Sequence, residues 1–198
     1  FNAAKAVVEF TGVNVHPGSS KNTMVNAALV AIEFNSMLPS ADTPRDTEEY
    51  EGFFHLDAMN GNVSTAMLDY IIRDHDAASF DCRLKTLEHI AKILNEKWGK
   101  GTVKLTITEQ YRNMKEVIDT CMELIDCATA ACKECGTPAL ITPIRGGTDG
   151  ARLSFMGIPC PNLGTGGHAF HGPYEHITVE GMDIAVNVGL KIIELFYK

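Results

Sequence analysis

The sequence lacks the features of a membrane-spanning or secreted protein. Among its 198 residues, no apolar run approaches the ~20 residues that span a bilayer. The first residues alternate like a strand and do not form a secretory signal. Positive charge is also scarce, since 17 Lys and Arg oppose 25 Asp and Glu, a formal net charge of −8. Nucleic-acid backbones and anionic membrane surfaces need clustered Lys and Arg. We therefore expect a soluble, cytoplasmic protein that binds neither nucleic acid nor membranes.

The six cysteines lack the spacing of a zinc ribbon. Cys132 and Cys135 form a C-x-x-C pair, but no second Cys or His pair follows at a ribbon-like distance, and the pair falls at a helix end. This pattern favours reduced thiols in the cytosol over a redox or metal site.

Residues 1–112 show the pattern of an antiparallel sheet with helices. Alternating and helical apolar spacing predicts, in order, a strand over 5–11, a helix over 24–38, strands over 53–58 and 66–73 around a turn at 59–62, a helix over 79–98 and a strand over 103–107. Ser79 is positioned to cap the second helix. The order β-α-β-β-α-β predicts a four-stranded antiparallel sheet with two helices on one face.

The pattern of apolar residues changes near Asn113, and residues 113–198 resemble part of an α/β domain. A long helix over 114–132 ends at Gly136, and a short helix over 150–155 and a last helix over 182–196 follow. Apolar runs at 139–144 and 159–163 predict strands covered on both faces. Two short strands cannot form a sheet alone, and the chain begins with Phe1 in a strand. The sequence therefore predicts a piece of a longer protein.

Two glycine-rich loops carry most of the candidate chemistry. Residues 164–176 hold three histidines, His168, His171 and His176, which is the type of cluster that binds zinc. The alternative is a surface loop whose histidines hydrogen-bond locally. In the other loop, Arg145 precedes Gly-Gly-Thr-Asp-Gly and is suited to a bidentate grip on a carboxylate. Its alternative is a tight turn capped by Asp149, with Arg145 in a salt bridge.

Several motifs occur together and in one order. They are Gly12-Val-Asn-Val-His16-Pro-Gly, Tyr70-Ile-Ile-Arg-Asp74, Pro143-Ile-Arg-Gly-Gly-Thr-Asp-Gly150, Phe155-Met-Gly-Ile-Pro-Cys-Pro-Asn162, the His171-Gly loop and Val179-Glu-Gly-Met182. With them the chain resembles the peptidase T family, tripeptide aminopeptidases of the dizinc aminoacylase and carboxypeptidase superfamily. The resemblance covers the whole chain but only the C-terminal half of the family's sequence. It implies a lid domain over 1–112, commonly used for homodimerisation, and the closing part of the catalytic domain over 113–198.

The resemblance also implies roles for five residues. His171 matches the family's last zinc ligand, and His168 matches a position that need not be histidine. His16 matches the lid histidine that stabilises the tetrahedral oxyanion. Arg73 and Arg145 match arginines suited to the terminal carboxylate of the peptide, and Asn113 is a further candidate for that pocket. Pro173 departs from the family pattern where relatives more often have a basic residue, which bears on substrate preference.

The implied reaction is zinc-assisted hydrolysis of the first peptide bond of a tripeptide. In the family, two zinc ions activate a water molecule and a Glu accepts its proton. The other zinc ligands and this Glu belong to the part of the family sequence before Phe1. The chain alone is therefore expected neither to hold zinc tightly nor to cleave peptides. A stand-alone dimerisation or peptide-binding module, and a related dipeptidase or deacylase, are the alternatives.

Overall fold

The computed structural model describes residues 1–197 and divides into two compact units, Phe1–Asn113 and Met114–Lys198. Across residues 1–197, every helix is too short or too polar to cross a membrane.

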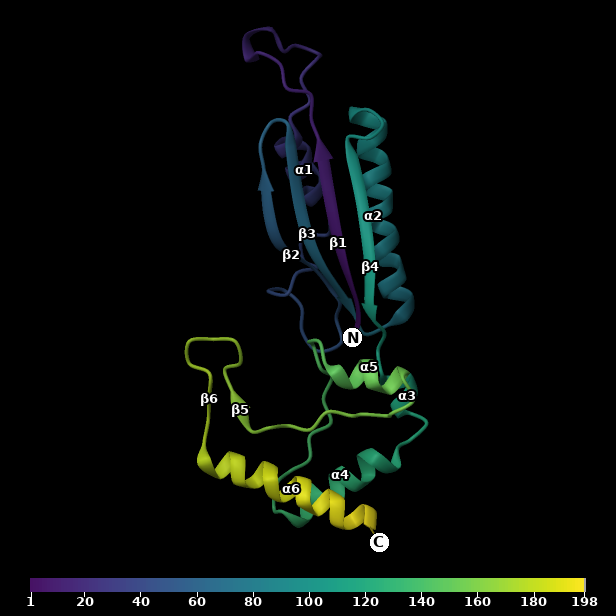
Figure 1. The fold of residues 1–198 in the computed structure, drawn as a ribbon, viewed down its shortest axis with the longest axis vertical. Helices are drawn as coiled ribbons and strands as arrows, with labels where there is room; N and C mark the ends of the chain where they lie inside the picture. Colours follow the sequence, from purple (N-terminus) through teal and green to yellow (C-terminus); the bar gives the residue numbers. More distant parts are fainter. Residues whose placement is uncertain (198) are drawn as a thin grey trace. The chain divides into compact units, whose positions relative to one another are not determined.

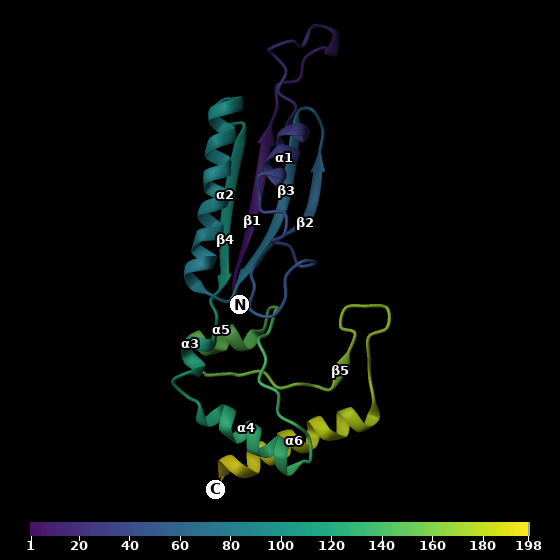
Figure 2. The same ribbon diagram turned by 180° about the vertical axis from the view of Figure 1, so that it is seen from behind.

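The first unit is built on a four-stranded antiparallel sheet (Figure 1). Its strands are β1 (Asn2–Thr11), β2 (Phe53–Gly61), β3 (Thr65–Asp74) and β4 (Val103–Tyr111), in the spatial order β2-β3-β1-β4. Helices α1 (Ala27–Ser36) and α2 (Ala77–Trp98) lie against one face of this sheet, as Figure 2 shows from behind. The predicted β-α-β-β-α-β order and the two helices on one face are confirmed.

The core of this unit lies between the sheet and its two helices. Alternate residues of β1 point into it because side chains of a strand alternate between its faces. The most deeply buried side chains of the core are Val8, Phe10, Val30, Phe34, Leu68, Tyr70, Ile72, Phe80, Leu87 and Leu94. Tyr70 keeps its hydroxyl satisfied by donating to Asn35 Oδ1 at 2.9 Å, and burial raises the pKa of that hydroxyl.

The hairpin between β2 and β3 turns later than predicted. Asn60 and Gly61 pair with Met67 and Ala66 inside the ladder, so the turn expected at 59–62 is wrong. Asn62 makes the turn instead, because its Oδ1 accepts the backbone N–H groups of Ser64 and Thr65. A Cβ added at Gly61 would stand 2.5 Å from the Cβ of Ala66. The absence of a side chain at Gly61 therefore lets β2 and β3 approach each other closely at this point.

Both helices of the first unit begin at side-chain caps. Asn26 accepts the backbone N–H groups of Ala28 and Leu29, which fixes the start of α1 at Ala27. The expected cap of α2, Ser79, is wrong: the cap is Asp76, whose Oδ1 accepts the Ser79 N–H at 2.7 Å. Not every apolar residue of α1 is buried, since Ile32 is 53% exposed.

The second unit consists of helices and one short hairpin. Its elements are α3 (Lys115–Ile118), α4 (Glu123–Glu134), α5 (Asp149–Phe155), β5 (Gly167–His168), β6 (His176–Ile177) and α6 (Val179–Tyr197). Helices α4 and α6 pack on each other. The long helix predicted over 114–132 is broken between α3 and α4, where the Thr120 hydroxyl donates to the Val117 carbonyl and diverts the backbone. Gly136, in the left-handed region at φ 72°, follows α4 as predicted.

The two strands predicted in this unit are absent from the described residues. Residues 139–144 and 159–163 are irregular, and Leu140 and Ile141 are 81% and 75% exposed. A strand needs a neighbour for its backbone N–H and C=O groups, and the only ladder in Met114–Tyr197 joins β5 to β6. Residues near 160 instead lie along α5, where the Cys160 N–H donates to Ser154 Oγ at 3.0 Å.

Candidate functional site

His16 lies in the loop that follows β1. A bridge between Val13 and Val25 closes the base of this loop. His16 is exposed and caps a 3-10 turn, Pro17–Ser19, with its Nδ1 accepting the Gly18 N–H at 3.1 Å. The predicted turn is present, and it fixes the imidazole through a backbone hydrogen bond.

Arg73 lies near the end of β3, on the sheet face opposite the helices. Its Nη1 donates to the carbonyls of Ala4 and Ile72, and its guanidinium lies over the Tyr111 ring at 5.4 Å. Burial lowers the pKa of Arg73 and raises that of Tyr111. Sequence reasoning missed Tyr111, because only the strand register brings it beside Arg73: both residues pair with Ala3.

Asn113 joins the two ends of the first unit. Its backbone N–H donates to Asn2 Oδ1 at 3.0 Å, and its side-chain amide donates to the His75 carbonyl at 3.1 Å. The Asn113 backbone N–H thus ties the end of β4 to the start of β1, and its side-chain amide is engaged by the residue that follows β3.

The three candidate residues of the first unit do not meet. Arg73 pairs with Ala3 at one end of β1, whereas His16 follows Thr11 at the other end. Eight residues of strand separate Ala3 from Thr11, which corresponds to roughly 26 Å. His16 therefore lies at the opposite end of the sheet from Arg73 and Asn113, as Figure 1 shows by the distance between the loop after β1 and the N-terminus.

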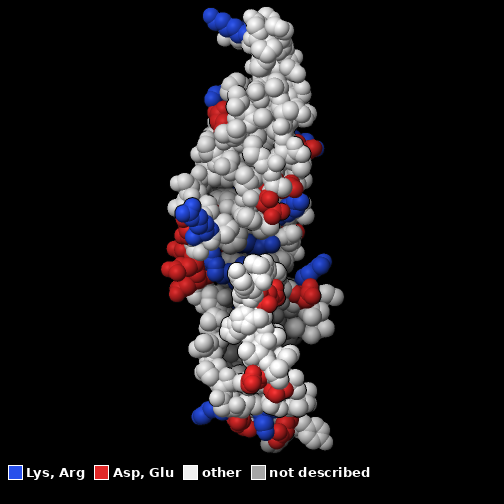
Figure 3. Space-filling view, turned by 90° about the vertical axis from the view of Figure 1, so that its left-hand side faces the viewer, with Lys and Arg blue, Asp and Glu red and all other residues white. Residues whose placement is uncertain are grey.

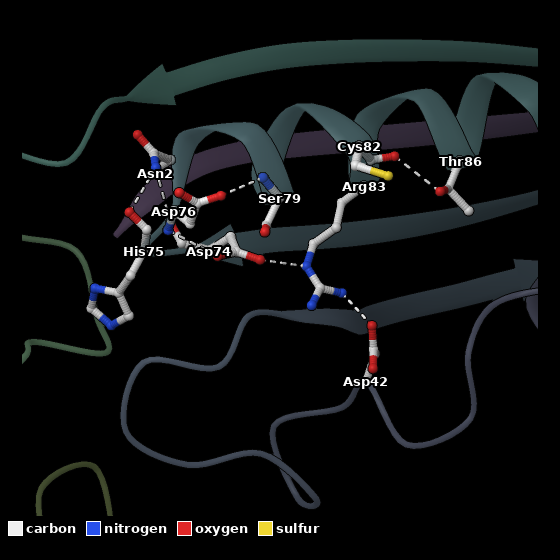
Figure 4. A network of polar contacts seen from close by, with 9 residues as sticks. All are labelled: Asn2, Asp42, Asp74, His75, Asp76, Ser79, Cys82, Arg83 and Thr86. Atoms are coloured by element: carbon white, nitrogen blue, oxygen red, sulfur yellow. Dashed lines mark hydrogen bonds and ion pairs between the residues drawn. The ribbon is translucent and has the colours of Figure 1, made fainter.

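A polar network that sequence reasoning missed lies at the start of α2 (Figure 4). Arg83 donates from Nε to Asp74 at 2.8 Å and from Nη1 to Asp42. Burial acts to lower the pKa of Arg83, but the hydrogen bonds to Asp74 and Asp42 outweigh it and raise that pKa. This network holds the loop before β2 against α2 and lines a hollow of about 400 Å³. Its acidic lining is not part of any predicted site.

Arg145 lies half-buried on the irregular segment before α5. The cap of α5 is Thr148, not the predicted Asp149: its hydroxyl accepts the Gly150 N–H and donates to Asn162 Oδ1 at 2.7 Å. A side chain at Gly150 would stand 2.4 Å from the Cys160 carbonyl, which explains the glycine at the start of this helix. Arg145 thus lies three residues before Thr148, which caps the first turn of the helix.

His171 lies at the tip of the β5–β6 hairpin. It is exposed, its φ is 63°, and its backbone N–H donates to Glu175 Oε2 at 2.9 Å. His168 and His176 pair across the two strands with their rings stacked 5.3 Å apart. The predicted glycine-rich loop is therefore a hairpin that carries His171 at its turn.

The residues of this chain do not by themselves fit a zinc pair. Zinc sites in enzymes use at least three protein ligands from His, Cys, Asp or Glu. Within residues 1–197, no three such side chains come close enough to hold a metal ion. The described residues therefore do not assemble the ligand set of a zinc site among themselves.

Comparison with known proteins assigns the family. Residues 1–102, just over half of the chain, match the family model of the M20 peptidase dimerisation domain. The chain is 53% identical to a peptidase T of Clostridium perfringens over 99% of its length, and 50% identical to a peptidase T of Alkaliphilus oremlandii over 100%. The chain belongs to the family of M20 peptidase dimerisation domains. It spans about half the length of these relatives, 48% in both cases, and matches their C-terminal half.

Solved structures give the same fold. A tripeptidase from Staphylococcus aureus superposes on 98% of the chain with a TM-score of 0.79 at 19% identity. An aminopeptidase PepT from Bacillus cereus superposes on 100% with a TM-score of 0.79 at 17% identity. The chain covers 51% and 52% of these two proteins. At these identities the agreement concerns the fold alone.

Proposed function

We propose that this chain is a segment of a zinc-dependent aminopeptidase that releases the N-terminal residue from tripeptides. The observation that carries this proposal is the 53% identity to a peptidase T along 99% of the chain. Relatives at that level of identity support a shared chemistry. These relatives are peptidases T, and one protein of similar fold is a tripeptidase.

Five residues are assigned roles within this proposal. His171 contributes one imidazole ligand to zinc, and His16 stabilises the oxyanion of the attacked carbonyl as a hydrogen-bond donor. Arg145 holds the terminal carboxylate of the peptide, since a guanidinium matches a carboxylate bidentately. Arg73 and Asn113 are the remaining candidates for this pocket. The contacts of Arg73 with Ala4 and Tyr111, and of the Asn113 side-chain amide with the His75 carbonyl, would orient these side chains and limit their freedom.

We further propose that the 198-residue chain alone is inactive. Its described residues contain no cluster of three metal-binding side chains. The apolar residues of 139–144 lie in solvent rather than in a sheet. Both features fit a catalytic domain whose other half supplies neighbouring strands and the remaining zinc ligands.

The test compares this chain with the full-length enzyme under identical conditions. Zinc content is measured by mass spectrometry after dialysis, and hydrolysis is measured on an unblocked tripeptide. We expect zinc and turnover only in the full-length enzyme, and loss of both zinc and turnover in its His171→Gln variant. A His176→Gln variant is the matched control, because His176 lies in the same hairpin and has no assigned role. Zinc near two per chain with turnover in the 198-residue chain would contradict an incomplete site.

A homodimer formed through residues 1–112 is part of the same proposal. The family model for this region is named for dimerisation. One tripeptide is about 10 Å long, so it cannot contact both His16 and Arg73 of one copy across roughly 26 Å. In a homodimer, His16 of one copy and Arg73 of the same copy could each contribute to a different active site. A dimerisation module without catalysis is the second candidate function. Measured turnover of a tripeptide by the full-length protein distinguishes it from the aminopeptidase.

We place the whole enzyme in the cytoplasm. The six cysteines are all free thiols in the structure, and free thiols persist in a reducing compartment. The expected result is that these six cysteines remain free thiols in enzyme isolated from the soluble cell fraction without reductant.

A further inference from the structure

The hydrogen bond between His16 and Gly18 determines which imidazole nitrogen carries the proton. The distance from Gly18 N to His16 Nδ1 is 3.1 Å. A backbone N–H can only donate, so Nδ1 must accept and carries no proton in this arrangement. In the neutral ring the proton then lies on Nε2, on the opposite side of the imidazole.

Because Gly18 has no side chain, it also leaves room for the His16 imidazole in this position. A Cβ added at Gly18 would stand 3.1 Å from His16 Cε1 and 3.2 Å from His16 Nδ1, closer than ordinary carbon contacts. The ring would have to shift by a few tenths of an ångström to accept it. Pro17 restricts the backbone between these residues, and the Ser19 N–H donates to the His16 carbonyl at 3.0 Å. The turn therefore presents its amide to the ring in a fixed geometry.

We propose that Gly18 is a positioning residue that holds His16 in the Nε2–H tautomer, with this proton presented away from the turn as a donor. The ligand that such a donor favours is an anionic oxygen, either an oxyanion or a carboxylate. The opposite tautomer would present a lone pair, which repels such an oxygen. The choice of ligand rests on the proposed function, whereas the tautomer and the hydrogen bond rest on the geometry of the turn.

The direct test is nuclear magnetic resonance of the uniformly ¹⁵N-labelled 198-residue chain, at a pH where its histidines are neutral. Long-range ¹H–¹⁵N spectra identify the protonated nitrogen of His16. A nitrogen–nitrogen coupling across the hydrogen bond identifies Gly18 N–H as the donor to Nδ1. We expect this coupling and a higher Nε2–H population than in the same chain unfolded in urea. Absence of the coupling, or a tautomer population equal to that of the unfolded chain, overturns the proposal.

A Gly18→Ala variant tests the role of the missing side chain. We expect the coupling to weaken and the tautomer population to move toward the unfolded value. Gly189→Ala is the matched control, because a Cβ there meets nothing within 4 Å, and it should leave the His16 signals unchanged. Signals of His16 that are identical in Gly18→Ala and the parent chain contradict the positioning role.

Turnover by the full-length enzyme separates this proposal from the proposed function. We expect His16→Ala to lower kcat by about 10²- to 10³-fold, as for loss of an oxyanion donor, and Gly18→Ala to lower kcat less. Adding Gly18→Ala to His16→Ala should have no further effect, since Gly18 acts through His16. Unchanged turnover in His16→Ala would refute the catalytic role while the coupling still reports on the turn. A further loss in the double variant would refute the positioning role.

Discussion

Asp74 is a buried carboxylate that forms an ion pair with Arg83. It is 3% exposed, and its carboxylate accepts Arg83 Nε at 2.8 Å and the Asp76 N–H at 3.0 Å. A buried carboxylate is tolerated when it is paired and hydrogen-bonded, and it becomes costly when its partner is removed. The pair also links α2 and β3 to the loop that carries Asp42 (Figure 4).

Replacing Arg83 by Met should destabilise the first unit by about 3 kcal/mol, because Asp74 is left buried without its cation. The measurement is urea unfolding followed by circular dichroism. The double variant Arg83→Met/Asp74→Asn should recover part of this loss. The control Arg112→Met removes an exposed arginine and should cost less than about 1 kcal/mol. Equal losses for Arg83→Met and Arg112→Met would contradict the importance of the buried pair.

We expect the protonation of Asp76 to make the stability of the protein depend on pH. Hydrogen bonds from Ser79, first its backbone N–H, lower the pKa of Asp76 below its ordinary value. A carboxyl with a lowered folded-state pKa stabilises the protein above its unfolded-state pKa, and this contribution is lost as the pH falls through the folded-state value. Asp76→Asn keeps a cap but cannot titrate. We expect its thermal midpoint to change less than that of the parent chain as the pH falls below about 4; parallel curves would refute this.

Among the elements, α1 exposes large apolar side chains on its outer face. Leu29 and Ile32, three residues apart and thus neighbours on one face, are 61% and 53% exposed. The helix carries a single charge, Glu33. Figure 3, which views the β2 side, shows a broad area without charged side chains below the loop that follows β1. Because β2 is an edge strand with unpaired backbone groups, this side is the one we expect to meet a second copy.

The paired substitution Leu29→Glu/Ile32→Glu should convert the dimer to a monomer, since two charges on each copy would face each other across the interface. Light scattering after size exclusion gives the mass, and circular dichroism checks that the helix content is kept. His89→Glu on the exposed side of α2 is the control and should remain dimeric. A parent chain that is monomeric at all concentrations, or a double variant that remains dimeric, would argue against this interface.

Elements with local signals were predictable, and those that depend on neighbours were not. The alternation of apolar and polar residues predicted β1, and the helical spacing of apolar residues predicted α2, because each element buries one continuous face. Residues 139–144 looked like a buried strand, yet a strand exists only where another strand pairs with it. The turn after β2 depended on the side chain of Asn62, which competes with the Asn-Gly signal just before it.

The candidate site was less predictable than the fold. His171 and Arg145 were found by their glycine-rich surroundings, and His16 and Arg73 stood out only through the family resemblance. Nothing local in the sequence indicates that Arg73 stacks on Tyr111, or that Arg83 bridges two aspartates, since both depend on long-range register. The roles of these residues therefore remain proposals that the experiments above address.

At the scale of the whole molecule, the core is concentrated in one unit. The large apolar cluster between sheet and helices lies entirely within Phe1–Asn113. In the second unit, α6 has one fully buried apolar residue, Val188. Burial of apolar surface is the main source of folding free energy, so the two units should differ in their stability.

Residues 1–113, expressed alone, should fold and unfold cooperatively in urea, whereas residues 114–198 alone should give a non-cooperative transition with fast amide exchange. Hydrogen exchange of the intact chain should show the slowest amides in β1 and β3, the two interior strands. Slow exchange in α6 comparable to that of β1 would contradict this expectation.

The hydrogen bond from Asn113 to Asn2 places the first and last residues of the lid beside each other. The polypeptide thus leaves this unit at almost the same point where it began, through two adjacent antiparallel strands. A module with such closely spaced connections can be carried by a host domain with little disturbance of the host's backbone.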